Sequence, residues 1–173
     1  DRVFAGVYSL FWNGGLISTE KNEQDDFIYF YSYVFQGGEL VELKVKSGES
    51  ESKTFNGSTD WAAVRTKYFL SALLPDAPGS FASLSAKNIN FGNRNQTPVY
   101  NMSIGYPLDV SSFASRLYLG PLDIDFISLT NTSLGSTMNW GWTLIRPISK
   151  GILWVLKYMH NALHLNYGLV LLL

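Results

Sequence analysis

Short aromatic and β-branched runs, separated by Gly, Pro and Asn clusters, dominate the chain up to about residue 120. The densest run is 27–35, which contains neither Gly nor Pro. Gly37 and Gly38 follow it as a turn signal, and 39–46 then mixes apolar and charged residues, so a β-hairpin is predicted. Further strand-like runs lie at 3–12, 99–106 and 113–119. Many short strands with turn signals between them predict a mainly β fold, a sandwich or a barrel.

One stretch, 60–74, is ambiguous from its pattern alone. It is compatible with a helix capped by Thr59 or Asp60 and ended by Pro75. It is equally compatible with two short strands joined at 65–67. Three polar stretches are predicted to be exposed turns or loops: 47–52, 56–57 and 86–98.

From Arg146 onward the pattern changes to a helical period. At 100° per residue, one face collects apolar residues: Ile148, Ile152, Val155, Leu156, Met159 and Leu163. The opposite face collects polar and basic residues: Arg146, Lys150, Lys157, Asn161 and His164, with Trp154 and Tyr158 near the boundary. Leu153 is an apolar residue on the polar side, and Pro147 suits the first helical position. The pattern fits an ordinary amphipathic helix that covers a core or an interfacial helix on a membrane.

The charges are divided unevenly along the 173 residues, a length that suits one domain. All 14 acidic residues lie in 1–125, together with ten of the 13 basic residues. The segment 126–173 contains no acid and three bases, Arg146, Lys150 and Lys157. An acidic body with a basic, apolar tail favours a membrane surface as the partner of the tail. It gives no support to nucleic-acid binding.

The last residues, 169–173, form an apolar run. A helix that spans a bilayer needs about 20 apolar residues, so this run is expected to be only the start of one. A spanning helix directly after the amphipathic segment favours the interfacial interpretation of that segment.

Residues suited to catalysis or metal binding are few. The chain has no Cys, which excludes disulfides and thiolate ligands. A spacing of two would place Asp123 and Asp125 on one face of a strand, where they could bind Ca²⁺ or act as an acid–base pair. The simpler interpretation of this pair, and of Asp25–Asp26, is that they are solvated carboxylates in turns or helix caps. His160 and His164 have the i, i+4 spacing of a shared metal, but no acid lies near them in the sequence. We therefore expect no catalytic residue, no cofactor, no metal and no enzymatic activity.

Four motifs follow one another along the chain. They are Trp12-Asn-Gly-Gly-Leu16 with Thr19-Glu20 and Asn22; Trp61 with Lys67-Tyr-Phe-Leu-Ser-Ala-Leu-Leu-Pro75; Leu117-Tyr-Leu-Gly-Pro-Leu-Asp123; and Trp140-Gly-Trp-Thr-Leu-Ile-Arg-Pro-Ile-Ser-Lys150, continued by Leu156-Lys-Tyr-Met-His160 and Asn166-Tyr-Gly-Leu169. Together they resemble the YidC family of bacterial membrane-protein insertases, part of the YidC/Oxa/Alb group. The match covers the chain from about Trp12 to Leu173.

The resemblance implies a fold and a domain division. The family's large periplasmic domain is a β-super-sandwich similar to galactose mutarotase, and this chain is expected to hold its C-terminal half, followed by short helices and the amphipathic helix. The stretch 61–75 is then strand–turn–strand. We expect the sandwich at 1–142, the interfacial helix at 143–165 and the start of a truncated transmembrane helix at 166–173.

The resemblance also implies a function: help with inserting and folding inner-membrane proteins, alone or with the Sec translocon, on the periplasmic side of the bacterial inner membrane. The expected partners are the inner-membrane lipid surface, Sec translocon components and nascent membrane proteins. The expected membrane-interface residues are Arg146, Lys150, Ile152, Trp154, Val155, Lys157 and Met159. The expected junction residues are Trp140, Gly141, Trp142 and Pro147.

Two other functions fit the pattern less well. One is a secreted β-sandwich module that binds carbohydrate or protein, with the tail packed as a core helix. The other is an enzyme of the mutarotase type, but no His occurs before residue 160 to act as a general base.

Overall fold

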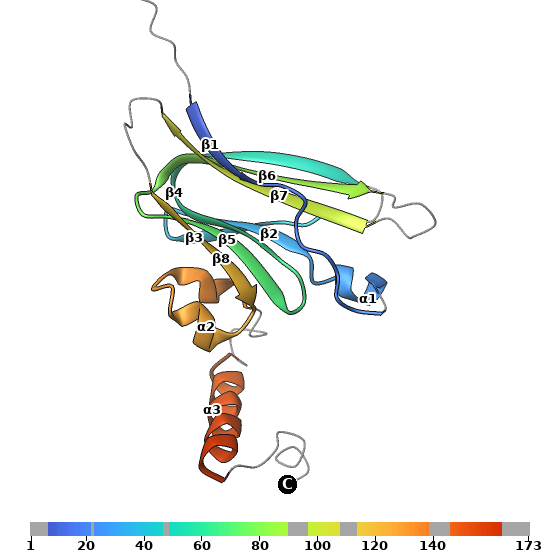
Figure 1. Cartoon of the computed structure of the whole chain (residues 1–173), viewed down its shortest axis with the longest axis vertical. Helices are drawn as coiled ribbons and strands as arrows, with labels where there is room; N and C mark the ends of the chain where they lie inside the picture. Colours follow the sequence, from blue (N-terminus) through green and yellow to red (C-terminus); the bar gives the residue numbers. More distant parts are fainter. Residues whose placement is uncertain are drawn as a thin grey trace, which may run out of the picture. The chain divides into compact units, whose positions relative to one another are not determined.

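The computed structural model describes residues 7–21, 23–46, 49–89, 97–107, 114–138 and 146–163. The chain divides into two units, 1–137 and 138–173. In chain order the first unit contains β1 (Val7–Trp12), α1 (Glu23–Phe27), β2 (Tyr31–Gln36), β3 (Glu39–Leu43), β4 (Ser50–Arg65), β5 (Phe69–Pro75), β6 (Gly79–Ile89), β7 (Thr97–Pro107), β8 (Ser115–Pro121), α2 (Ile124–Ser128) and the 3-10 helix η1 (Ser133–Thr137) (Figure 1). The second unit contains α3 (Arg146–Leu163).

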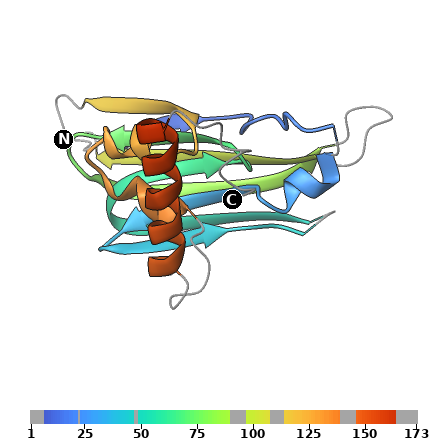
Figure 2. The same cartoon turned by 90° about the horizontal axis from the view of Figure 1, so that it is seen from below.

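One antiparallel sheet forms both layers of the sandwich. Its strand order is β1-β7-β6-β4-β2-β3. β5 branches off this order by pairing with β4, and β8 pairs with β5. The first half of β4 pairs with β6, and its second half pairs with β2 and β5. Figure 1 shows β1, β6 and β7 in one layer and β2, β3, β5 and β8 in the other. The strands run lengthwise along the sandwich and α1 lies at one end of them (Figure 2). The expectation of a mainly β sandwich is confirmed.

β4 passes from one layer to the other at a double bulge. Its pairing with β6 shifts register between Asn56 and Thr59, and the pairing of β2 with β4 shifts between Phe35 and Gln36. Gly57 lies at this point with φ +123°, a region that is essentially restricted to glycine. The prediction of a turn at 56–57 is therefore wrong, whereas the predicted exposure of both residues is confirmed. The Asn-Gly pair supplies a positive φ, as in a turn, but here both flanking segments stay paired and the glycine forms a bulge.

The core lies between the two layers and follows the period-2 alternation of the strands. In β6 the buried residues alternate with partly exposed ones, and Ala82, Leu84 and Ala86 point inward. The core residues are Phe30, Val34, Leu43, Val45, Ala62, Val64, Leu73, Ala82, Leu84, Ala86, Tyr100, Met102, Ile104 and Tyr106. The backbone N–H of Val45 donates to the Tyr100 hydroxyl over 3.1 Å, which ties a loop of one layer to a strand of the other.

Several predicted elements are confirmed and others need correction. The hairpin at Gly37 and Gly38 joins β2 and β3, and 61–75 is strand–turn–strand. The strand predicted at 27–35 begins only at Tyr31, because α1 and a turn precede it. β4 begins at Ser50, inside the stretch 47–52 predicted to be a turn. β6 extends to Ile89, inside the predicted loop 86–98. Its core positions alternate with serines, so the strand has few of the large apolar residues by which strands are usually recognised.

Gly57→Ala tests the bulge. We expect this variant to lose on the order of 1–3 kcal/mol of unfolding free energy, because alanine is strained at this φ and its Cβ would lie 2.8 Å from Nε2 of Gln36. Urea unfolding of the purified chain measures the difference. Ser58→Ala, at the neighbouring exposed position, should change the free energy by less than about 0.5 kcal/mol. Equal stabilities for the two variants would contradict the role given to Gly57.

Candidate functional site

The helix α3 exposes its apolar face. Ile148, Ile152 and Val155 share that face and expose 60%, 55% and 46% of their surface. Leu156 and Met159 on the same face are partly buried. Three of the five described residues on this face are therefore exposed.

Two aromatic residues lie beside this face. Trp154 and Tyr158 are one helical turn apart, and their rings stack with centroids 5.8 Å apart and planes inclined by 16°. Both are well exposed, at 68% and 61%. Tryptophan and tyrosine are the residues that collect at membrane–water interfaces, since their rings are apolar and their N–H or O–H groups are polar.

The remaining predicted site residues are only partly described. Lys150 is exposed and Lys157 is partly buried, and the helix contains no acidic residue to balance them. Pro147 lies in the first turn of α3 and is exposed. Arg146 is the first residue of the helix, but its side chain lies outside the described part. The predicted junction residues Trp140, Gly141 and Trp142 also lie outside the described residues, as do His164 and 166–173.

The segment α2–η1, which precedes the second unit, covers the outer face of the β4–β5 layer. The sheet register places Trp61, Ala63 and Arg65 of β4 on this face, opposite buried residues of β5. Ile127 of α2 and Leu134 of η1 are also fully buried. The second half of β4 is thus buried on both faces, which explains its unbroken run of buried residues from Trp61 to Arg65.

Two side chains of β4 hold η1 in place. The indole Nε1–H of Trp61 donates to Oγ of Ser133 over 2.8 Å, and the Trp61 ring stacks on Phe35 with centroids 5.3 Å apart. The guanidinium Nη1 of Arg65 donates to the carbonyl oxygen of Thr137, the last residue of η1. We call this pair of hydrogen bonds the exit clip, because it fixes the point at which the chain leaves the first unit.

Arg65 is an unusual residue to find in such a place. Only 5% of its surface is exposed, and its guanidinium donates to the backbone carbonyls of Thr66 and Thr137. Its guanidinium also lies 5.9 Å from the ring centroid of Tyr31. Burial raises the pKa of the neighbouring Tyr33 phenol from 10.0 to about 12, and the positive charge of Arg65 opposes that rise. Tyr33 therefore remains neutral over the physiological pH range.

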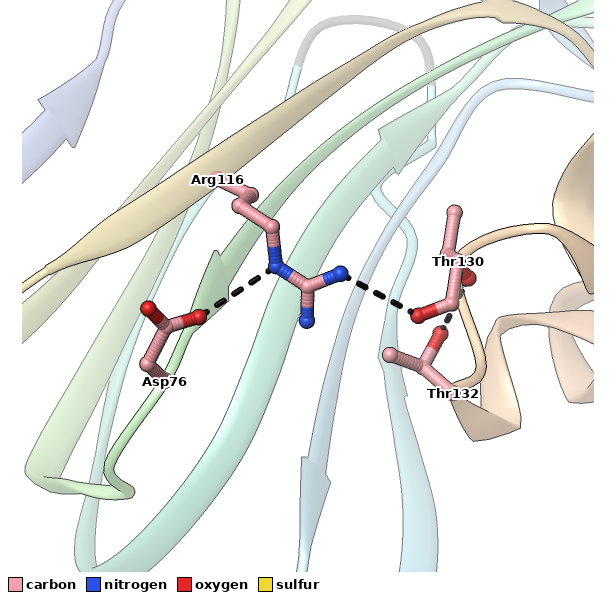
Figure 3. A network of polar contacts seen from close by, with 4 residues as sticks. All are labelled: Asp76, Arg116, Thr130 and Thr132. Carbon is pink, nitrogen blue, oxygen red and sulfur yellow. Dashed lines mark hydrogen bonds and ion pairs between the residues drawn. The ribbon is translucent and has the colours of Figure 1, made fainter.

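A second arginine makes a contact of a different kind. Arg116 of β8 donates from Nε to Oδ1 of Asp76 and from Nη1 to the carbonyl of Thr130, both over 3.3 Å (Figure 3). The hydroxyls of Thr130 and Thr132 are 2.7 Å apart. The side chains of Arg116 and Asp76 are more than half exposed, so their ion pair contributes little to stability.

The acidic residues occupy structural positions. Asp123 caps the N-terminus of α2 and accepts from the backbone N–H of Asp125 over 2.8 Å. The pair therefore does not share a strand face, and the simpler interpretation of Asp123 as a cap is confirmed. Asp26 is 2% exposed and accepts from the Ser18 hydroxyl over 2.5 Å, so the expectation of a solvated carboxylate is wrong for this residue.

Within the described ranges, no three His, Asp or Glu side chains come together as potential metal ligands. Across the same ranges, every helix is too short or too polar to cross a bilayer.

The sequence did not reveal the exit clip. Trp61 and the stretch 61–75 belong to a family motif, but the sequence pattern predicts no role for Trp61, Arg65, Ser133 or Thr137. One signal was available: Arg65 is a charged residue that ends a run of apolar residues, Trp61-Ala-Ala-Val. A charge in such a run must find polar partners when it is buried.

Comparisons with known proteins give a consistent result. A family model described as the YidC periplasmic domain matches residues 8–155. The chain is 31% identical over 180 residues to the membrane protein insertase YidC of Prosthecochloris aestuarii, covering 100% of this chain and 30% of that relative. It is 34% identical over 172 residues to the YidC of Chlorobium phaeovibrioides, covering 96% and 29%. The chain thus spans about 30% of the length of these relatives. No solved structure matches.

Arg65→Gln tests the exit clip. We expect a loss of about 1–3 kcal/mol in unfolding free energy, because the buried carbonyl of Thr137 loses its donor. Arg116→Gln removes the same charge from an exposed contact and should cost between 0 and about 1 kcal/mol. Urea unfolding of both variants measures the contrast. An equal loss of unfolding free energy in Arg116→Gln and Arg65→Gln would contradict the stabilising role given to the exit clip.

The raised pKa of Tyr33 predicts alkaline destabilisation. Below pH 10 the phenol is neutral in both states and has no effect. Between pH 10 and about 12 the unfolded chain releases this proton while the folded chain retains it, so stability falls as the pH rises, by on the order of 2 kcal/mol. Unfolding at pH 8 to 11.5 should therefore show a steeper loss for the native sequence than for Tyr33→Phe. Parallel curves would contradict the assignment.

Proposed function

The chain belongs to the YidC family of membrane protein insertases, and from this premise we propose that α3 lies along the outer surface of the inner membrane and orients the sandwich beside the insertion core of the full-length protein. The region that this chain matches is the family's periplasmic domain, on the periplasmic side of the inner membrane. The family is one of insertases, in agreement with the prediction that the chain is not an enzyme.

One observation carries the proposal: the exposed apolar face of α3. Ile148, Ile152 and Val155 together leave a large apolar surface uncovered in the described part of the chain. Complete burial of each such side chain contributes about 1.5–3 kcal/mol. A bilayer interface provides that burial for one face of a helix and leaves the opposite, basic face near the lipid headgroups.

The position of the aromatic and basic residues supports the same orientation. The stacked rings of Trp154 and Tyr158 lie at the border between the two faces, at the depth where aromatic side chains are enriched in membranes. Lys150 and Lys157, together with Arg146, bring positive charge without any acid. Each basic residue near an anionic surface contributes about 1 kcal/mol to binding.

The junction residues are proposed to turn the chain from the sandwich into the membrane plane. Gly141 lies between the two indoles of Trp140 and Trp142, and glycine adopts backbone angles that other residues avoid. Pro147 fixes φ in the first turn of α3. On this proposal the interfacial helix occupies 143–165, and 166–173 begins the next transmembrane helix.

The sandwich is proposed to bind translocation partners. Sec translocon components and periplasmic loops of nascent membrane proteins are the two kinds of partner that we expect. The relatives are named membrane protein insertases, which supports membrane proteins as the substrates of the complete protein.

A pair of neighbouring substitutions tests the orientation of α3. Ile152→Gln should lower the partition coefficient of the chain on vesicles about tenfold, since a buried apolar side chain is lost. Leu153→Gln makes the same kind of change one residue along, on the polar side, and should lower it less than about twofold. Vesicle co-sedimentation measures both. Equal effects of the two substitutions would contradict an α3 that lies on a membrane by its apolar face.

The junction is tested in cells. Full-length protein carrying Gly141→Val or Pro147→Gly should complement an insertase-depleted strain poorly, because the chain can no longer make the required turn. Substitutions in the exposed stretch 50–52 of β4, such as Ser52→Ala, are the control and should leave growth unchanged. Growth defects of equal size in both groups would remove the special role of the junction.

A further inference from the structure

One end of the sandwich carries an exposed cluster of aromatic, apolar and lysine side chains. We call it the aromatic–lysine tip, and it consists of Ile28, Tyr29, Lys44, Lys67, Tyr68 and Phe69. The four uncharged members expose between 38% and 55% of their surface. Ile28 and Tyr29 lie in the turn before β2, and Tyr68 and Phe69 lie at the hairpin between β4 and β5. The pairing of β2 with β4 brings these two segments together.

The lysines hold the tip together. Nζ of Lys67 lies 4.9 Å from the ring centroid of Tyr68 and 5.7 Å from that of Tyr29, so the ammonium bridges the two segments. Nζ of Lys44 donates to the carbonyl of Ile28 over 2.6 Å and to the Tyr31 hydroxyl over 2.9 Å. A hydrogen bond with Tyr68 raises the pKa of Lys67.

The tip lies where the chain leaves the sandwich. Arg65, which is bonded to the carbonyl of Thr137, precedes Lys67 by two residues. From Thr137 to Arg146 there are nine Cα–Cα steps, which span at most roughly 30 Å when fully extended. Whatever the course of that segment, the start of α3 is tethered within this distance of the anchored exit.

We propose that the aromatic–lysine tip is a second contact of the protein with the anionic surface of the bilayer, separate from α3. The inference rests on the proposed function, because the tether brings the tip near a membrane only if α3 lies on one. The chemistry of the tip fits a lipid surface. Tyrosine rings and aliphatic side chains enter the interfacial region, and lysine ammonium groups bind lipid phosphates. The carboxylate of Glu20 also acts on Lys67, so the aromatic and aliphatic side chains carry much of the contact.

The absence of Cys from the sequence allows single-site labelling of the 173-residue chain. An environment-sensitive fluorophore at Ile28→Cys reports on the tip and leaves Lys67 and both tyrosines in place. The same fluorophore at Trp154→Cys reports on α3. The control carries the same fluorophore at Ala77→Cys. Ala77 lies in the exposed turn after β5, at the opposite end of that strand from Phe69. Vesicles of phosphatidylcholine with 30% phosphatidylglycerol are the probe.

The three labels separate the possible outcomes. We expect blue shifts at 28 and 154 and none at 77. A shift at 154 alone would overturn the second contact and leave the proposed function of α3 standing. No shift at 28 or at 154 would overturn both. A shift at 77 as large as that at 28 would indicate non-specific adsorption. A blue shift at 28 that appears without vesicles and grows with protein concentration would indicate that the tip is a contact between two copies of the chain. Either of these last two results overturns the inference.

A charge substitution gives an independent test. Lys67→Gln should lower the partition coefficient on these vesicles about fivefold and leave binding to pure phosphatidylcholine unchanged. Lys87→Gln removes the same charge from an exposed site on β6 and should have less than a twofold effect. Equal effects of the two substitutions would overturn the inference, because binding would then depend on overall charge alone.

Discussion

The hydrogen bond from the buried Arg65 guanidinium to the carbonyl of Thr137 fixes the last residue of the first unit on the sheet. A guanidinium that is 5% exposed needs acceptors for its N–H groups, and the end of η1 supplies one of them. Together with the bond between Trp61 and Ser133, this requirement keeps α2–η1 on the outer face of the sheet. The chain therefore leaves the sandwich from a fixed point.

The clip depends in turn on the bent strand β4. Its first half lies in one layer and its second half, which carries Trp61 and Arg65, lies in the other. The bulge at Gly57 makes this possible. A single strand thus joins the two layers, contributes to the core on one face and holds the exit segment on the other.

Local patterns in the sequence predicted the fold class, the hairpin at Gly37 and Gly38 and the amphipathic helix that the structure begins at Arg146. They failed where tertiary pairing decides the conformation. The Asn-Gly pair at 56–57 predicts a turn, because the sequence does not show that the strand segments on both sides of it stay paired. Arg65 gains its importance only when η1 packs over it, and no spacing rule connects two residues so far apart in the chain. The family resemblance resolved 61–75, which periodicity left open.

In the proposed function, α3 lies on the membrane surface by its apolar face. Spin labels placed singly at consecutive positions from 148 to 159 of the 173-residue chain provide the measurement. Their accessibility to oxygen and to a water-soluble nickel complex is recorded on anionic vesicles. We expect oxygen accessibility to peak with a period of 3.6 residues at Ile148, Ile152 and Val155, with nickel accessibility highest on the opposite face. Accessibilities that do not change when vesicles are added, or that lack this period, would contradict it.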